Sequence, residues 1–364
     1  MKVGTRLVTR GAGELNEEFL ASLVRQIRQL HEQGMQVLVV TSGAVHLGSG
    51  FLSQVRQRSE LSARQAAAAI GQPSLMHRYV EALGREGLVG AQILLTTQDI
   101  QDRSRYLRIR NALQVLLSEG VVPIINENDT VSVEGVTFGE NDRLAAVMAG
   151  ALRVDLVIFL SDQPGLFTAD PRCDADAEFV PVVMPGDEIC QYAAGAGGTE
   201  SRGGMGKKVE AAQLAVECGI PLVIANGEDP DIVVRIVAGE EVGTLFVAGR
   251  APTSWKLWLA TALEPAGSLV VDDGACRALQ ERDGSSLLPV GVLEVRGEFQ
   301  AGDLVRVLSA QGKEIARGLV NYASGEISAL RGHHSREITA LLGRHAGDEE
   351  VIHRDNLVVI RSGN

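Results

Sequence analysis

Residues 121–146, VVPIINENDTVSVEGVTFGENDRLAA, carry a pattern from which the fold class can be predicted. The stretch begins with an apolar run, continues with polar residues, and ends at the start of a segment with helical periodicity. It places two Asn-Asp pairs, Asn128-Asp129 and Asn141-Asp142, on either side of a short glycine-containing segment. Because the apolar run has no polar face and a helix follows it, the pattern predicts a strand of a parallel sheet that is covered on both sides.

The same alternation of helix and strand extends outward from this stretch in both directions. Helical periodicity predicts helices over residues 16–33, 102–119, 141–152 and 206–219. Each is followed by an apolar run, and these runs read MQVLVVTSG (35–43), VVPIIN (121–126), DLVIFLSD (155–162) and PLVIAN (221–226). The alternation predicts an α/β fold, a three-layer αβα sandwich with a mainly parallel sheet.

The predicted strands end in small or polar residues. These ends are Thr41-Ser42-Gly43, Asn126-Glu127-Asn128-Asp129 and Ser161-Asp162-Gln163. In open α/β sheets ligands bind beyond the carboxyl ends of the strands, so these residues are candidates for a binding site. For one Asn-Asp pair alone, a role as turn former or helix cap is an equally good interpretation.

The pattern changes after about residue 250. RAPTSWKLWLATALEPAG (250–267) reads as a connector, and short strands with Gly and Asp turns follow it. We therefore expect a first domain over residues 1–249, a linker over 250–265, and a small β-barrel-like domain over 266–364.

Composition limits the class of protein. With 34 basic and 46 acidic residues the net charge is −12, which argues against wholesale binding of nucleic acid. No run of 18 or more apolar residues and no signal-peptide pattern occurs, so we expect a cytoplasmic protein without membrane spans. The four cysteines are far apart in sequence and form no CxxC motif. This spacing favours free thiols, and it predicts no metal site.

Two lysine-bearing segments indicate phosphate chemistry. Only five lysines occur, and Lys207 and Lys208 follow a glycine-rich segment, residues 203–206, that leads into a predicted helix. Backbone N–H groups, the positive end of the helix dipole and the lysines together suit an anion. A P-loop is excluded because it would need Gly in place of Ser201 and Ser or Thr in place of Lys208. A flexible loop before a helix remains the alternative.

The motifs taken together resemble the glutamate 5-kinases, which form part of the amino acid kinase family. The matching segments are KVGTRLVT, VVTSGAVHLG, VVPIINENDTV, GENDRLAA, FLSDQPGLFTADPR and GGMGKKVEAA. Further segments resemble a PUA domain, among them GSSLLPVGV, IARGLVNY, GHHSREI and EVIHRDNLV. The resemblance implies the amino acid kinase fold followed by a PUA domain, and ATP-dependent phosphorylation of the side-chain carboxylate of L-glutamate.

The resemblance also implies roles for residues at the strand ends. Ser42, Asp129 and Asn141 correspond to glutamate-binding positions, with Asn126 and Asp142 close by. A carboxylate such as Asp129 suits the substrate ammonium, whereas Asn141 and Ser42 can donate hydrogen bonds to its carboxylate.

For the transfer step, the resemblance implies that Lys2 and Lys208 flank the phosphoryl group, that Asp162 orients the lysines, and that Mg²⁺ accompanies ATP. The ATP-contacting positions correspond to Lys2, Ser161, Asp162, Arg202, Gly203, Gly204, Met205, Gly206, Lys207 and Lys208. Only Met1 precedes Lys2, so we expect either a start farther upstream or a clipped first strand that anchors Lys2 poorly.

Two other functions stay open on the sequence alone. One is a degenerate kinase that acts in RNA binding or regulation through the PUA domain, although residues 266–364 carry 11 basic and 14 acidic residues and lack a basic footprint. The other is a kinase for another amino acid or a carbamate. The family further suggests feedback inhibition by proline and a homodimer or homotetramer.

Overall fold

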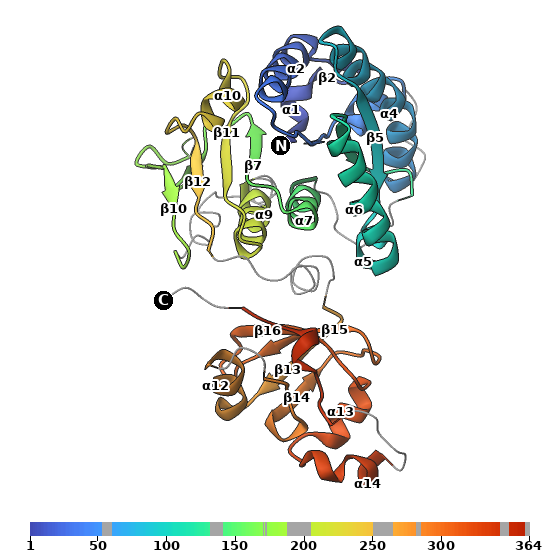
Figure 1. Cartoon of the computed structure of the whole chain (residues 1–364), viewed down its shortest axis with the longest axis vertical. Coiled ribbons are helices and arrows are strands. Elements are labelled where there is room, and N and C mark those ends of the chain that lie inside the picture. The colour runs from blue at the N-terminus through green and yellow to red at the C-terminus, as the bar shows by residue number, and fades with distance from the viewer. Residues whose placement is uncertain are drawn as a thin grey trace. The chain divides into compact units, whose positions relative to one another are not determined.

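The computed structural model describes residues 1–52, 60–131, 141–169, 171, 173–187, 205–249, 265–281, 285–342 and 349–360. The chain divides into two compact units, Met1–Ala251 and Pro252–Asn364 (Figure 1). This division falls within the predicted linker. Residues 250–264 lie outside the described residues, so the linker itself stays a prediction.

An eight-stranded sheet forms the centre of the first unit. Its strands, in spatial order, are β10 (Val182–Val183), β12 (Thr244–Phe246), β11 (Leu222–Asn226), β7 (Val157–Ser161), β1 (Lys2–Val3), β4 (Val39–Val40), β6 (Val122–Glu127) and β5 (Gly90–Leu95). Every neighbouring pair is parallel except β11 and β12. The predicted α/β fold with a mainly parallel sheet is therefore confirmed.

Helices cover both faces of this sheet (Figure 1). They are α1 (Thr5–Val8), α2 (Glu17–Glu32), α3 (Ala44–Ser49), α4 (Glu60–Arg85), α5 (Thr97–Gln101), α6 (Arg103–Ser118), α7 (Asn141–Leu152), α9 (Met205–Glu217) and α10 (Ile232–Val237). The four predicted helices correspond to α2, α6, α7 and α9, and their first and last residues differ from the observed ones by at most two. Two short hairpins, β2 (Thr9–Gly11) with β3 (Glu14–Leu15) and β8 (Leu166–Phe167) with β9 (Phe179–Val180), complete the unit.

Helix α4 was not predicted, and it crosses α3 at two glycines. A Cβ atom on Gly48 would lie 1.8 Å from the carbonyl oxygen of Ala67, and one on Gly71 would lie 1.9 Å from that of Ala44. Only the absence of both side chains lets the backbones approach so closely. The crossing brings α4 against the segment that leaves β4, where the candidate site begins.

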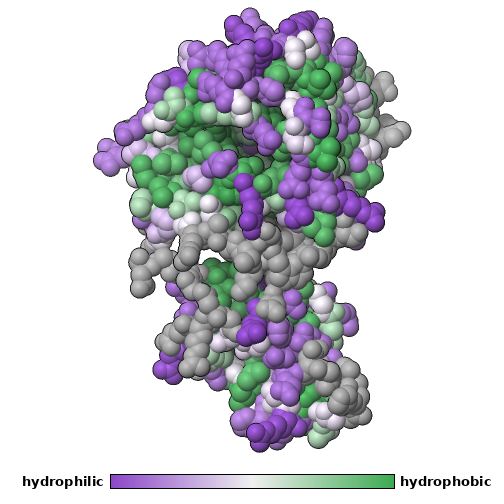
Figure 2. Space-filling view, in the orientation of Figure 1, coloured by the Kyte–Doolittle hydropathy of each residue, from purple (hydrophilic) through white to green (hydrophobic). Residues whose placement is uncertain are grey.

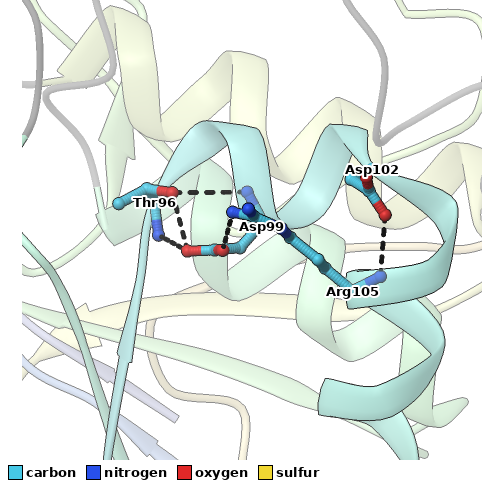
Figure 3. A network of polar contacts seen from close by, with 4 residues as sticks. All are labelled: Thr96, Asp99, Asp102 and Arg105. Atoms are coloured by element: carbon cyan, nitrogen blue, oxygen red, sulfur yellow. Dashed lines mark hydrogen bonds and ion pairs between the residues drawn. The ribbon is translucent and has the colours of Figure 1, made fainter.

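The turn after β5 is fixed by a network of polar contacts (Figure 3). The Thr96 N–H and hydroxyl both donate to Asp99 Oδ2, at 2.8 and 2.6 Å, and Arg105 Nη1 donates to Asp99 Oδ1 at 3.0 Å. The Asp102 carboxylate in turn accepts from the Arg105 N–H at 2.9 Å and caps α6. The carbonyl oxygen of Leu95, just before this turn, accepts from the N–H of Asn128 at 2.8 Å. This backbone bond holds the β5 end beside the β6 end, and the polar network fixes the turn that follows β5.

The second unit has its own sheet and core. Five strands lie in the order β14 (Val292–Arg296), β13 (Gly267–Val271), β15 (Leu304–Leu308), β16 (Glu314–Leu319) and β17 (Leu357–Val359), antiparallel except for β13 with β15. The helices are α12 (Asp273–Glu281), α13 (Ser324–Leu330) and α14 (Ile338–Leu342), with 3₁₀ turns at Pro289–Gly291, Ser335–Glu337 and Arg354–Asn356. Its apolar side chains form a cluster separate from that of the first unit.

The expectations about membrane spans and cysteines can be compared with the described residues. Among them, no helix combines the length and the apolar character that a membrane span requires. Cys173, Cys218 and Cys276 are free thiols, whereas Cys190 lies outside the described residues.

Candidate active site

Two lysines from distant parts of the chain meet one carboxylate. Lys2, on the central strand β1, places Nζ 2.6 Å from Asp142 Oδ1, and Lys208, in the first turns of α9, places Nζ 3.9 Å from Asp142 Oδ2. The side chains of Lys2 and Asp142 are only 8% and 6% exposed, so the pair is shielded from solvent. Helices α7 and α9 lie side by side, which brings Asp142 and Lys208 together (Figure 1).

Lys2 is firmly held, which disfavours one of the two alternatives, a clipped first strand that anchors it poorly. Strand β1 pairs in parallel with both β4 and β7, in the middle of the sheet. The next turn is fixed as well, because the N–H of Gly4 donates to the carbonyl oxygen of Leu160 at 3.0 Å. Two neighbouring strands therefore fix the direction of the Lys2 side chain.

The carboxylate that contacts both lysines is Asp142, whereas Asp162, for which the resemblance implies an orienting role, pairs with Arg6. Asp162 accepts a hydrogen bond from Arg6 Nη1 at 2.7 Å, and its side chain is 34% exposed. Asp162 follows β7, whereas Asp142 is the second residue of α7 and lies within 4 Å of both lysine Nζ atoms. Lys208 acts on Asp162 as a nearby charge, so Asp162 still belongs to the same site.

The pKa of Asp162 reflects two opposed effects. Partial burial raises the pKa, but the hydrogen bond from Arg6 and the charges of Arg6 and Lys208 outweigh burial, so the pKa lies below the ordinary value. A depressed carboxyl pKa contributes stability at neutral pH, and this contribution is lost as the pH falls through the folded-state pKa.

We expect Arg6→Ala to raise the pKa of Asp162, because burial then acts with less opposition. The measurement is a carbon-13 NMR titration of labelled aspartate carboxyls, with Asp162→Asn to assign the signal. Arg10→Ala, which removes an exposed pair with Glu18 in the same segment, serves as the control and leaves the Asp162 titration unchanged. An Asp162 midpoint that stays in place in Arg6→Ala would contradict the expectation.

A chain of amide and hydroxyl groups joins the ends of β4 and β6 to α7. Asn141 Nδ2 donates to Ser42 Oγ at 3.0 Å and to Asn126 Oδ1 at 3.1 Å. Asn126 Nδ2 donates to Gln72 Oε1, on α4, at 2.7 Å. Three of the five predicted substrate-binding residues, Ser42, Asn126 and Asn141, thus lie in direct contact.

The hydrogen bonds that Asn141 makes leave the Ser42 hydroxyl free to donate. Both hydrogens of its Nδ2 are used by Ser42 and Asn126, and its Oδ1 accepts from the N–H of Glu127 at 3.2 Å. Since Ser42 Oγ accepts from Asn141, its own hydroxyl hydrogen remains available for a ligand. Asn141 therefore orients Ser42, and Ser42 is the group able to donate.

The turn that carries Ser42 depends on the following glycine and on a buried hydroxyl pair. Gly43 has φ +111° and begins α3, and a Cβ there would approach Thr9 Cγ2 to 3.3 Å. The hydroxyl groups of Thr41 and Tyr79 lie 2.9 Å apart in the core, where burial raises the pKa of Tyr79 to about 12. Tyr79 thus stays protonated and ties α4 to the end of β4.

Asp129 lies at the end of β6, beyond the amide chain. Burial raises the pKa of its carboxyl above the ordinary value, and the charge of Arg64 opposes this only partly. A buried carboxylate of this kind gains from a cation placed beside it. Asp129 is therefore suited to a positively charged ligand group.

The glycine-rich segment is described only from Met205 onward. Met205, Gly206, Lys207 and Lys208 form the first turn of α9, as the sequence predicts. The predicted ATP-contacting residues Arg202, Gly203 and Gly204 lie outside the described residues. Ser161 is buried at the end of β7, where its Oγ accepts from the N–H of Gln163 at 3.0 Å.

Two residues of the site were missed by sequence reasoning. Gln72 lies within the unpredicted helix α4, and Arg6 lies in the short helix α1 after Lys2. Neither belongs to a spacing pattern that carries chemistry.

The face of the first unit seen in Figure 2 is hollowed near its middle, with apolar surface inside and hydrophilic surface around it.

Known proteins resemble this chain over its whole length. A model of the amino acid kinase family matches residues 1–226, and a model of the PUA domain matches residues 267–342. The chain is 44% identical to a glutamate 5-kinase of Caldanaerobacter subterraneus subsp. tengcongensis, over 100% of this chain and 98% of that protein. It is 46% identical to a glutamate 5-kinase of Geobacter metallireducens, over 99% and 96% of the two chains. For a glutamate 5-kinase of Deinococcus radiodurans the identity is 44%, over 99% of both chains.

Proposed function

Because the chain belongs to the glutamate 5-kinases of the amino acid kinase family, we propose that it phosphorylates the side-chain carboxylate of L-glutamate with ATP. The product is L-glutamyl 5-phosphate, the first intermediate of proline synthesis. The observation that carries the proposal is the buried meeting of Lys2, Asp142 and Lys208 at the carboxyl ends of the strands.

The transfer step needs positioning and charge neutralisation above all. A side-chain carboxylate oxygen of glutamate attacks the γ-phosphorus, the bond between this phosphorus and the β,γ-bridging oxygen breaks, and ADP leaves with that electron pair. Lys2 and Lys208 supply fixed positive charge beside the oxygens that become more negative, and Asp142 holds both ammonium groups in place. The attacking carboxylate is already ionised, so no general base is required.

The amino-acid end of the substrate fits the polar residues beyond the lysines. The free hydroxyl hydrogen of Ser42 suits a carboxylate oxygen, and Asp129 suits the ammonium group. When that ammonium is bound, the pKa of Asp129 should fall, because the cation favours the ionised carboxyl. Asn126 and Asn141 act by orienting Ser42 and one another.

ATP fits between the end of β7 and the first turn of α9, with Ser161, Asp162 and residues 202–208 as its contacts. Within the described ranges no cluster of three or more His, Cys, Asp or Glu side chains could hold a metal ion. Phosphate oxygens and water would hold the magnesium ion that accompanies ATP, and the partly exposed Asp162 is an available carboxylate. When bound, the magnesium ion neutralises phosphate charge.

The test is the production of an acyl phosphate. Purified protein with ATP, Mg²⁺ and L-glutamate should consume ATP and, when hydroxylamine is present, give a hydroxamate that depends on L-glutamate. Lys2→Ala should lower this rate by about 100-fold or more, since a fixed charge at the transferring group is lost. Hydroxamate from another amino acid but none from L-glutamate would overturn the substrate assignment.

Several properties of the family extend the proposal. We propose inhibition by L-proline, a homodimer or homotetramer, and action in the cytoplasm, as for a biosynthetic kinase. RNA binding through the PUA domain is disfavoured, because residues 266–364 carry a net charge of −3. A salt-sensitive mobility shift of labelled RNA would revive that alternative.

A further inference from the structure

The side-chain amide of Gln72 has an unusual environment. Its Oε1 accepts from Asn126 Nδ2 at 2.7 Å, but its Nε2 is buried and has no hydrogen-bond partner among the described residues. A buried donor that lacks an acceptor loses its hydration without compensation. A bound ligand that supplies a hydrogen-bond acceptor would satisfy such a group.

The orientation of this amide is forced by a backbone group. The N–H of Glu127 can only donate, and it bonds Asn126 Oδ1 at 2.9 Å and Asn141 Oδ1 at 3.2 Å. Both oxygens therefore face Glu127, which turns Asn126 Nδ2 toward Gln72. Rotating the Gln72 amide by half a turn would set two NH₂ groups against each other, so Nε2 must point away from Asn126.

The position of Gln72 indicates which end of the substrate it meets. Strands β1, β4 and β6 are consecutive in the sheet, about 4.8 Å apart, so the ends of β1 and β6 are separated by about 10 Å. A glutamate whose reacting carboxylate lies beside Lys2, on β1, extends its other end toward β6. Gln72 contacts the β6 residue Asn126, and Asp129 follows the same strand.

We propose that Gln72 Nε2 donates a hydrogen bond to the α-carboxylate of bound L-glutamate. Gln72 is then a specificity residue that recognises this carboxylate while Asp129 receives the α-ammonium. Its second contact, with Asn126, fixes the rotamer in which the donor is presented. The inference rests on the proposed function, since it assumes that the reacting carboxylate lies beside the lysines.

The test compares two ligands and two variants of the full chain. Gln72→Met removes donor and acceptor at similar length, and should raise the KM for L-glutamate by about ten-fold or more while the KM for ATP stays within about two-fold. Inhibition by 4-aminobutyrate, which lacks the α-carboxylate, should change by no more than about two-fold in the same variant. Gln72→Glu keeps an oxygen for Asn126 but sets a carboxylate against the substrate, so it should bind L-glutamate no better than Gln72→Met.

A matched control separates recognition from stability. Gln26, on α2, is a buried glutamine, and its Oε1 accepts from the N–H of Val233 at 2.8 Å. Gln26→Met should lower the midpoint of thermal unfolding without raising the KM for L-glutamate.

Three outcomes would overturn the assignment. One is an unchanged KM for L-glutamate in Gln72→Met, and another is an equal loss of affinity for 4-aminobutyrate. The third is recovery of L-glutamate affinity in Gln72→Glu, which would leave Gln72 as a support for Asn126 alone. If the wild-type protein forms no glutamate-dependent hydroxamate, the proposed function itself fails, and the inference falls with it.

Discussion

Asp142→Asn should lower kcat by about 100-fold or more, and it should also destabilise the protein by about 3–5 kcal/mol. The carboxylate lies between two lysines, and the Lys2 side chain beside it is only 8% exposed. Removing the negative charge leaves a buried ammonium without its partner and releases both lysines from their fixed positions. Steady-state kinetics and denaturant unfolding measure the two effects.

A double variant separates these effects. Lys2→Met combined with Asp142→Asn removes the buried pair as a whole, so most of the lost stability should return, because an apolar group of similar length needs no counter-charge. Activity should not return, since the lysine is absent. If Asp142→Asn alone keeps kcat within about two-fold of the wild type, Asp142 does not orient the lysines.

Gly71→Ala should destabilise the first unit by about 2–3 kcal/mol, which corresponds to a thermal midpoint lower by several degrees. The new Cβ would lie 1.9 Å from the carbonyl oxygen of Ala44 and 2.6 Å from the N–H nitrogen of Gly48, so α3 and α4 must move apart. Because Ser42 precedes α3 and Gln72 follows Gly71, we also expect a higher KM for L-glutamate.

Gly84→Ala provides the control on the same helix. Nothing lies within 4 Å of a Cβ at Gly84, so the change should be neutral or stabilising by up to about 1 kcal/mol, through higher helix propensity. Equal thermal midpoints for Gly71→Ala and Gly84→Ala would show that the helix crossing tolerates a side chain. The prediction for Gly71 would then be wrong.

Much of the fold could be predicted because it depends on local patterns. The apolar runs at β6, β7 and β11 have no polar face, and the helices that precede them repeat apolar residues at helical spacing. Helix α4 was missed because its sequence contains glycines and Pro73, which are unfavourable inside a helix. Its place is set by close backbone packing against α3, which no local pattern encodes.

The parallel sheet and the polar strand ends could be predicted without the structure, since both follow from the order of apolar and polar residues along the chain. The sequence also supplied the motifs that contain Lys2, Ser42, Asn141 and Lys208. The folded chain was needed to show that both lysines contact Asp142, and that Gln72 completes the amide chain. These contacts join residues far apart in sequence, and they depend on how helices pack against the sheet edge. Side-chain direction at such an edge follows from packing, not from spacing along the chain.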